Sequence, residues 1–416
     1  MKKYFSLYPT THYIKDDIEG ALYNTLNGQI IGLNREQIEI IEQALDGYEV
    51  NSFKSDEIEF LKLLEKNILG SFYDNKIKIE TTYWGSNKYF EKMLDSRKKI
   101  EILQIELTNK CPYCCKFCDK NSNLVYRRTG CKKWNNKADN LSLNEWIDLI
   151  NQAYLIGCRK IEIFGGDPVI EWDILSNIII FSNKLGIKDI SLYTTGILID
   201  DVKIKFMIEH RVHCIIQIIK FDNNMSVLGI DREINYKSVI EKFLDDNLNF
   251  EILLLINKYN EDKIDEYINF MKDSNINFKI DFIYPNPKND YFSKKYSKFL
   301  LNYKKHIIQC NPVNFGVLLN KNACYYNRIG IGLDGEIYPC ILSRRESYGN
   351  FRENNKLVDN LNSKFEFFKN LNKDKYSYCK SCVYRYGCLT CSAIDYNSDK
   401  TELNCINCSR VGNSNE

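Results

Sequence analysis

The sequence has 416 residues, enough for two or three domains, and a formal net charge of +2, which indicates no overall attraction to nucleic acid or to an anionic membrane. Its 16 cysteines suit a reducing cytoplasm, with thiols free or bound to metal, better than a secreted disulfide framework, which is typical of short chains. Residues 4–9 are too short and too polar for the apolar core of a signal peptide, and the longest aliphatic run, residues 252–256, cannot span a bilayer.

The first strands are predicted within residues 3–33. Asn27-Gly28 predicts a two-residue hairpin turn between residues 23–26 and residues 29–33. We therefore expect a small antiparallel sheet at the start of the chain.

Two helices are predicted after this sheet. Asn34 and Gln37 have the spacing of a capping box, so one helix is expected from there to Asp46-Gly47, and a second from Ser55 to Gly70. The residues expected on their apolar faces are Ile38, Ile41 and Leu45 in the first helix and Ile58, Leu61, Leu64 and Ile68 in the second. Residues 71–98 have no clear period and are expected to be a linker.

From residue 100 onward, predicted strands and helices alternate. The first helix of this region is expected from Ser142, with Glu145 as its capping-box partner, to Gly157. The strands are expected at residues 100–107, 160–164, 188–193, 213–219, 249–256 and 276–283. Six such alternations favour a parallel sheet with crossover helices. Residues 119–141, rich in Lys, Asn and Arg, interrupt the alternation and are expected to be a flexible cover.

Three cysteines follow the first of these strands with C-x3-C-x2-C spacing: Cys111, Cys115 and Cys118. Thiolates are the protein ligands of iron–sulfur clusters, and three of them leave one iron of a 4Fe–4S cluster open. The alternatives are three incidental thiols or a zinc site, although zinc sites favour paired C-x2-C motifs. Cys114 fits no ligand position.

Polar residues also end the second, third and fourth strands. Gly165-Gly166-Asp167-Pro168 combines glycines, which permit close backbone approach to a ligand, with a carboxylate that can accept a hydrogen bond from an amine, but it also suits an ordinary turn. Tyr193-Thr194-Thr195-Gly196 offers hydroxyls to a sugar or simply ends its strand. Gln217 lies on the fourth strand.

The C-terminal region is rich in cysteines. Asp334-Gly335 predicts a hairpin turn that places Cys340 at the end of a short return strand. The cysteines of this region are Cys310, Cys324, Cys340, Cys379, Cys382, Cys388, Cys391, Cys405 and Cys408. C-x2-C pairs alone would favour a zinc ribbon. Cys131 has no predicted role, and Cys158 and Cys214 are expected to be core thiols.

The cysteine loop, with the aromatic Phe117 before its last cysteine, resembles the signature of the radical S-adenosylmethionine (SAM) superfamily. The resemblance implies a partial (β/α)6 TIM-like barrel in which Cys111, Cys115 and Cys118 hold a 4Fe–4S cluster and SAM binds the open iron. An electron from the cluster then cleaves SAM to a 5′-deoxyadenosyl radical. The implied SAM contacts are Phe117, Gly165, Gly166, Asp167, Pro168, Thr194, Thr195 and Gln217. Two positions depart from the family. Asp167 stands where the usual GGEP motif has Glu, and Thr195 stands where the usual Thr-Asn-Gly motif has Asn.

The C-terminal cysteines resemble the SPASM extension of radical SAM peptide-modifying enzymes. The similarity lies in residues 334–340, in Tyr348-Gly349-Asn350 and in the C-x2-C-x5-C series. It implies two auxiliary 4Fe–4S clusters. The first cluster would be held by Cys324, Cys340 and Cys391, with Cys310 as a possible fourth ligand. The second cluster would be held by Cys379, Cys382 and Cys388, with Cys405 or Cys408. Only two residues separate Cys388 from Cys391, where relatives usually have three.

The order of the N-terminal elements is similar to the winged-helix recognition domain of ribosomal-peptide maturases, in which a leader peptide adds a strand to the sheet edge. A structural role for this domain fits equally well. The expected domains are residues 1–75 for leader recognition, 76–98 as a linker, 99–303 as the radical SAM core and 304–416 as the SPASM-like domain.

The resemblance implies an enzyme that cross-links a ribosomally made peptide through thioether or carbon–carbon bonds. A sulfatase-maturase-like enzyme that forms formylglycine is the enzymatic alternative, and an iron–sulfur or zinc-binding partner protein is the non-catalytic one. The expected partners are the precursor peptide and a low-potential electron donor of the flavodoxin or ferredoxin type, with no nucleic acid and no membrane.

Overall fold

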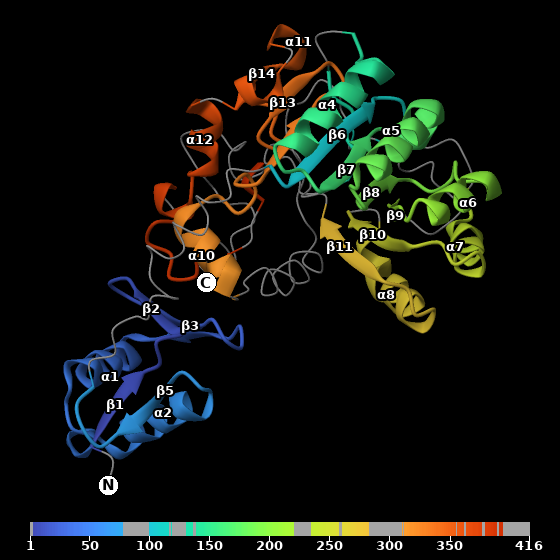
Figure 1. Ribbon diagram of the computed structural model, residues 1–416. Coiled ribbons are helices and arrows are strands. Elements are labelled where there is room, and N and C mark those ends of the chain that lie inside the picture. The colour runs from blue at the N-terminus through green and yellow to red at the C-terminus, as the bar shows by residue number, and fades with distance from the viewer. Residues whose placement is uncertain are drawn as a thin grey trace. The chain divides into compact units, whose positions relative to one another are not determined.

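The computed structural model describes residues 3–77, 100–115, 118, 130–135, 139–219, 234–257, 260–282, 310, 312–354, 356–361, 363–376, 379–388 and 391–393. The chain divides into two compact units (Figure 1). The first unit contains residues 1–98, 303–326 and 369–390, and the second contains residues 99–302, 327–368 and 391–416. Among the described residues, no helix combines the length and apolar character needed to cross a membrane.

The N-terminal part of the first unit contains two small antiparallel sheets and two helices. In one sheet β1 (Tyr4–Leu7) pairs with β5 (Gly70–Tyr73), and the other has the order β2 (Thr11–Lys15), β3 (Gly20–Asn24), β4 (Ile30–Leu33). The helices are α1 (Arg35–Asp46) and α2 (Ser55–Lys66), joined through the 3-10 turn Val50–Ser52. The predicted capping box of Asn34 and Gln37 is present, and Leu22, Ile41 and Leu61 are buried in one core.

Three expectations for this region are wrong in detail. The hairpin between β3 and β4 has no two-residue turn, because the Asn24 side chain accepts hydrogen bonds from the main chain of Leu26 and Asn27 and so forms a wider loop. Leu45 is 42% exposed and Ile68, which follows the end of α2 with a φ of 59°, is 53% exposed. Residues 71–73, for which no regular structure is predicted, belong to β5, and residues 78–99 of the predicted linker lie outside the described residues.

The three-stranded sheet packs its other face on the C-terminal segments of the same unit. Ala21 and Tyr23 of β3 share a core with Phe315 and Leu318 of α10 (Pro312–Asn320), and the Tyr23 hydroxyl donates to the main-chain oxygen of Val383 at 2.5 Å. The 3-10 turn Lys373–Lys375 also lies in this unit. The first unit therefore combines segments that the sequence predicts as separate N-terminal and C-terminal domains.

The second unit is built on a nine-stranded sheet in the order β11-β10-β9-β8-β7-β6-β12-β13-β14. The strands are β6 (Ile102–Thr108), β7 (Lys160–Gly165), β8 (Asp189–Thr194), β9 (His213–Ile218), β10 (Phe250–Ile256), β11 (Phe278–Phe282), β12 (Arg328–Ile331), β13 (Glu336–Tyr338) and β14 (Gly349–Asn350). Pairing is parallel from β11 to β12 and antiparallel from β12 to β14. All six predicted barrel strands are present, so the α/β class with a parallel sheet is confirmed.

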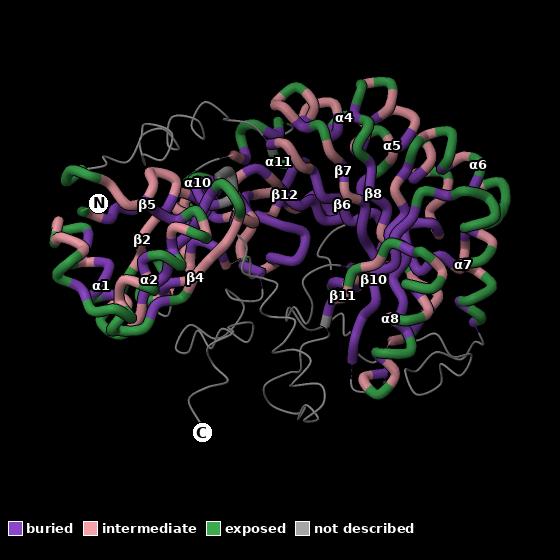
Figure 2. The backbone as a smooth tube through the Cα atoms, turned by 90° about the horizontal axis from the view of Figure 1, so that it is seen from below, coloured by how far each residue is buried: buried purple, intermediate pink, exposed green. Residues whose placement is uncertain are grey.

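Helices connect the parallel strands and lie along the sheet (Figure 1). They are α4 (Leu143–Leu155), α5 (Trp172–Leu185), α6 (Asp201–Glu209), α7 (Tyr236–Asp245) and α8 (Ile264–Asp273). Shorter elements are α11 (Phe351–Asn354), α12 (Ser363–Lys369) and the 3-10 turns Pro168–Glu171, Glu261–Lys263 and Leu357–Asn360. The predicted capping box of Ser142 and Glu145 starts α4. Every residue of β10 is buried, as expected of a central parallel strand covered on both faces (Figure 2).

Candidate functional site

The cysteine loop leaves the carboxyl end of β6 and is held by the loop that follows β7. The main-chain N–H of Gly166 donates to the oxygen of Thr108 at 2.7 Å, and that of Asp167 donates to the oxygen of Lys110 at 2.8 Å. A Cβ atom at Gly166 would lie 2.1 Å from the Lys110 oxygen, and Gly165 has a φ of 147°. Close contact with the cysteine loop therefore requires both glycines. The sequence predicts a different reason for them, which is close approach of the backbone to a ligand.

Asp167 is fully buried, and its carboxylate is occupied by protein hydrogen bonds. It accepts from the hydroxyl of Thr194 at 2.8 Å, from the N–H and hydroxyl of Thr195 at 3.1 and 2.5 Å, and from the N–H of Val169 at 3.2 Å. Burial raises the pKa of Asp167, and the hydrogen bonds from Thr195 and Thr194 oppose that shift. Asp167 joins the ends of β7 and β8 and does not line the pocket described next. These donors occupy the carboxylate that the sequence predicts as an acceptor for an amine, and Pro168 begins the adjacent 3-10 turn.

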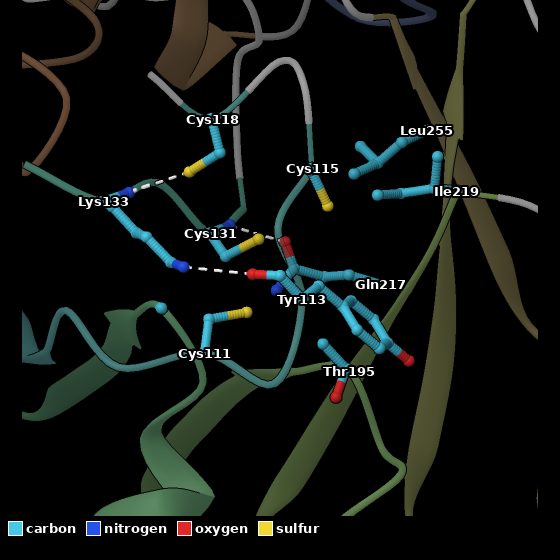
Figure 3. Close-up of a pocket in the computed structure, with 11 residues that line it drawn as sticks. Cys111, Tyr113, Cys115, Cys118, Cys131, Lys133, Thr195, Gln217, Ile219 and Leu255 are labelled. Carbon is cyan, nitrogen blue, oxygen red and sulfur yellow. Dashed lines mark hydrogen bonds between the residues drawn. The ribbon is translucent and has the colours of Figure 1, made fainter. Parts of the chain in front are cut away.

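A pocket opens at this end of the strands (Figure 3). Four cysteines line it, the predicted Cys111, Cys115 and Cys118 together with Cys131. The other lining residues are Tyr113, Lys133, Gly166, Thr195, Gln217, Ile219 and Leu255. The structure thus brings Gly166, Thr195 and Gln217 to the same pocket as the cysteine triplet, as the sequence predicts. Cys114, predicted to be a bystander, is exposed.

Residues 130–135 form one wall of this pocket, and hydrogen bonds tie them to the cysteine loop. Asn109 and Trp134 are joined twice, at 2.7 and 2.8 Å, and the N–H of Lys133 donates to the Sγ of Cys118 at 3.1 Å. The Lys133 ammonium donates to the main-chain oxygen of Tyr113 at 3.0 Å. A flexible cover is expected over residues 119–141, and within this stretch Lys133 and Trp134 are hydrogen-bonded to the cysteine loop.

Gln217, on β9, carries a buried donor without a partner. Its side chain is only 3% exposed, and its Oε1 accepts a hydrogen bond from the N–H of Cys131 at 2.6 Å. Within the described part of the chain, no group pairs with Gln217 Nε2. An unsatisfied buried donor costs about 1–3 kcal/mol, and this atom can donate to an oxygen acceptor of a group bound in the pocket.

Burial sets the electrostatics of the cysteine loop. It raises the pKa of the Cys111 thiol to about 12, and the neighbouring Cys131 adds to the shift. Tyr113 and Tyr236 share a hydrogen bond of 2.9 Å between their hydroxyls, and burial raises the pKa of both. A low-dielectric pocket of this kind favours thiolates only when a cation or metal cluster compensates their charge.

A buried ion pair supports the pocket wall from behind. The Arg344 guanidinium lies 2.6 Å from the Glu106 carboxylate on β6, with side-chain exposures of 4% and 1%. Arg344 also lies over the rings of Trp134 and Tyr338, at 4.8 and 4.5 Å from their centroids. The segment after β13 is thereby fastened to both β6 and the wall that contains Trp134.

The remaining predicted site residues fall into three groups. Thr194 is buried and bound to Asp167, away from the pocket lining. Phe117, Cys405 and Cys408 lie outside the described residues. Of the auxiliary-cluster cysteines, Cys310, Cys324, Cys379, Cys382 and Cys388 belong to the first unit, and Cys340 and Cys391 to the second. In the described chain, no three Cys, His, Asp or Glu side chains converge on one metal ion.

Cys158 and Cys214 are fully buried, which confirms their prediction as core thiols. Burial raises the pKa of Cys158 to about 11 and that of Cys214 to about 12. The Asp334-Gly335 turn is also present between β12 and β13, where Gly335 has a φ of 86°. The pocket residues that the sequence did not indicate are Tyr113, Cys131, Lys133, Ile219 and Leu255.

Known proteins resemble this chain in both sequence and fold. Residues 105–284 match the Radical SAM superfamily. The chain is 28% identical over 191 residues to a GTP 3′,8-cyclase of Clostridium perfringens (strain 13 / Type A), and this match covers 44% of the chain and 55% of that enzyme. The chain thus spans about half the length of this relative.

Two solved structures have a similar fold. One is Streptococcus suis SuiB bound to the precursor peptide SuiA, with a TM-score of 0.50 and 18% identity over 92% of this chain and 94% of SuiB. The other is anSMEcpe with bound AdoMet and the Cp18Cys peptide, with a TM-score of 0.51 and 17% identity over 72% of this chain and 91% of that one. At these identities the likeness concerns the fold alone.

Proposed function

Residues 105–284 form a radical SAM domain, and from this premise we propose that the chain binds SAM in the four-cysteine pocket and modifies a ribosomally made peptide. In this proposal Cys111, Cys115 and Cys118 hold a 4Fe–4S cluster with one open iron. SAM bound there would supply a 5′-deoxyadenosyl radical for abstraction of a substrate hydrogen atom.

The observation that carries the SAM proposal is the unpartnered Nε2 of Gln217. A carboxylate or ribose oxygen of SAM would satisfy this buried donor. Lys133 supplies positive charge for the SAM carboxylate, and Thr195, just after β8, offers its hydroxyl oxygen as an acceptor while the hydroxyl proton is donated to Asp167. Gly165, Gly166, Asp167, Pro168 and Thr194 act by holding the cysteine loop and Thr195 in place. Phe117 remains a proposed contact on the basis of the motif alone.

A peptide substrate is supported by the two structural neighbours, which were solved with peptides bound. The N-terminal sheet and helices are proposed to bind the leader of that peptide, and cross-linking through a thioether or carbon–carbon bond is the favoured reaction. The C-terminal cysteines, as grouped above, are proposed to hold two auxiliary 4Fe–4S clusters. A flavodoxin or ferredoxin in the cytoplasm would supply the electron.

Two other activities have specific support. The sequence relative is a GTP 3′,8-cyclase, which favours a nucleotide as the second candidate substrate. Formylglycine formation on a Cys or Ser side chain is the other peptide-based candidate, supported by the fold that this chain shares with anSMEcpe, which was solved with the Cp18Cys peptide.

One anaerobic experiment separates these activities. The reconstituted enzyme is incubated with SAM, a strong reductant and, in parallel, the short peptide encoded beside its gene, a Cys-containing peptide or GTP. We expect about twelve irons per chain. Of the three substrates, only the precursor peptide should react, and it should lose two hydrogen atoms per cross-link. Consumption of GTP, or an aldehyde on the Cys-containing peptide, would replace the cross-linking proposal. Stoichiometric zinc without iron would exclude all three.

A further inference from the structure

Cys131 is a fourth sulfur in a pocket for which the proposed cluster needs only three. It lines the same space as Cys111, Cys115 and Cys118, and Figure 3 shows its side chain among theirs. It lies beyond the C-x3-C-x2-C motif, in the pocket wall that comprises residues 130–135. The question is what a further thiol does next to a cluster with an open iron.

The chain fixes the main chain of Cys131 at this place. Its N–H donates to Gln217 Oε1 at 2.6 Å. Gly130, just before it, has a φ of 99°, and a Cβ atom there would lie 2.3 Å from the same Oε1. On the other side, Lys133 is bonded to Cys118 and Tyr113, and Trp134 to Asn109. The position of this thiol in the pocket is therefore built from several contacts.

Thiolates are the protein ligands that iron–sulfur clusters use most, and four of them saturate a 4Fe–4S cluster. We infer that Cys131 is an exchangeable fourth ligand, which binds the open iron while SAM is absent and leaves when SAM binds. The inference rests on the proposed SAM cluster of Cys111, Cys115 and Cys118.

The exchange requires no oxidation or reduction. The bond between the Cys131 sulfur and iron breaks, the amino nitrogen and a carboxylate oxygen of SAM bind in its place, and the released thiolate takes a proton from solvent. Gln217 serves both states, since its Oε1 holds the main chain of Cys131 while its Nε2 is available to an oxygen of SAM. One side chain thus links the placement of Cys131 to the binding of SAM.

The test compares full-length Cys131→Ala and Cys131→Ser with the unchanged protein under anaerobic conditions. SAM affinity is measured by equilibrium dialysis. The EPR signal of the reduced SAM-binding cluster is obtained by subtracting the spectrum of the triple variant Cys111→Ala, Cys115→Ala, Cys118→Ala. If Cys131 occupies the iron in about nine-tenths of SAM-free molecules, its removal lowers the apparent Kd for SAM about tenfold. Without SAM, the EPR signal of both variants should differ from that of the unchanged protein. At saturating SAM, the signals of all three proteins should coincide. Cys114→Ala, in the same loop but exposed, is the matched control and should change neither.

Two results would overturn the inference. Equal SAM affinities together with identical SAM-free spectra would mean that Cys131 does not bind the iron. Loss of about four irons per chain in Cys131→Ala would mean that it is a permanent ligand. If the triple variant keeps its full iron content and still cleaves SAM, the proposed function is overturned as well. If the triple variant is inactive while Cys131→Ala keeps the SAM affinity and SAM-free spectrum of the unchanged protein, only the role of Cys131 is overturned.

Discussion

Asp167 and Thr195 are joined by two hydrogen bonds, because the N–H and the hydroxyl of Thr195 both donate to Oδ2 of Asp167, at 3.1 and 2.5 Å. Asp167 is fully buried, whereas Thr195 lines the four-cysteine pocket. The carboxylate therefore acts on the pocket through Thr195. This relationship accounts for the joint presence of Asp in the Gly-Gly-Asp-Pro loop and Thr in the Thr-Thr-Gly turn.

Replacing Thr195 by Val should weaken both the fold and SAM binding. The change removes a hydrogen bond to a buried charged group, so the free energy of unfolding should fall by about 1.5–3 kcal/mol. The apparent Kd for SAM should rise, because the lost hydroxyl lies in the pocket. Thr194→Val is the matched control, since Thr194 also donates to Asp167 but does not line the pocket. Denaturant unfolding and SAM dialysis of both variants check this, and equal SAM affinities would contradict the pocket role of Thr195.

The three motif cysteines should be necessary for SAM cleavage. Changing Cys111, Cys115 and Cys118 together to Ala should abolish 5′-deoxyadenosine formation, because no ligands remain for the cluster that reduces SAM. Much of the C-terminal iron should remain bound. Product analysis by chromatography and iron analysis provide the measurement, with Cys158→Ala, a buried thiol remote from the pocket lining, as the control. Reductive cleavage of SAM by the triple variant would show that the cluster ligands are misassigned.

The Glu106–Arg344 pair should be important for the stability of the second unit. Arg344→Met leaves the buried Glu106 carboxylate without its counter-charge, which should lower the free energy of unfolding by about 3–5 kcal/mol. Adding Glu106→Gln removes the uncompensated charge and should recover part of the loss. Arg352→Met breaks the more exposed pair with Glu145 and should cost under about 1 kcal/mol. Denaturant unfolding of the four proteins measures these differences, and equal losses for Arg344→Met and Arg352→Met would contradict the argument.

The C-terminal cysteines should contribute to folding through metal binding. Cys340→Ala or Cys382→Ala should lower the iron content and reduce the thermal stability of the C-terminal region, because cluster binding adds to the free energy of folding. Iron analysis and limited proteolysis of anaerobically reconstituted protein give the measurement, with Cys214→Ala as a control outside this region. Stoichiometric zinc and no iron in the unchanged protein would exclude the auxiliary clusters.

Local patterns were enough to predict most of the second unit. The six strands are short apolar runs separated by helices, and Ser142 and Glu145 form their capping box as expected. The spacing of Cys111, Cys115 and Cys118 directly indicated a shared site, since all three lie in one loop. Gln217 could be placed because it lies on the fourth strand, beside the strand that ends just before Thr195.

Other features depend on contacts between distant residues, which no local pattern indicates. Cys131 reaches the pocket through Gln217, and Trp134 is held by Asn109, so the wall formed by residues 130–135 is not visible in the composition of that segment. Asp167 stands where the family motif usually has Glu, and its carboxylate turns toward Thr195 because that turn supplies donors. The joint core of Tyr23 and Phe315 likewise depends on segments that are far apart in the sequence.

The edge of β2 is the place where a leader peptide is expected to bind. In the described chain, β2 pairs with β3 on one side and with no strand on the other. Hydrogen bonds run from the Thr25 N–H to the Thr10 oxygen and from the Asp16 N–H to the Glu19 oxygen. Because inward-facing and outward-facing residues alternate along an antiparallel strand, these bonds show that the main-chain groups of Thr10 and Asp16 face β3. The main-chain groups of Tyr13 and Lys15 therefore face outward from the sheet, available to an added strand.

Lys15→Pro should therefore block leader binding and leave the sheet intact. Proline removes the outward N–H of residue 15, and the loss of about 1.4 kcal/mol from one such bond corresponds to about tenfold in Kd. Lys15→Ala is the matched control, because it removes the same exposed side chain and keeps the N–H. Deletion of residues 1–75 is less informative, since it would also uncover Phe315 and Leu318, which pack against Ala21 and Tyr23. A labelled leader peptide is titrated against the three proteins, and SAM cleavage without peptide should stay unchanged. Equal leader affinity for the Pro and Ala variants would mean that the leader binds elsewhere and that this sheet has a structural role.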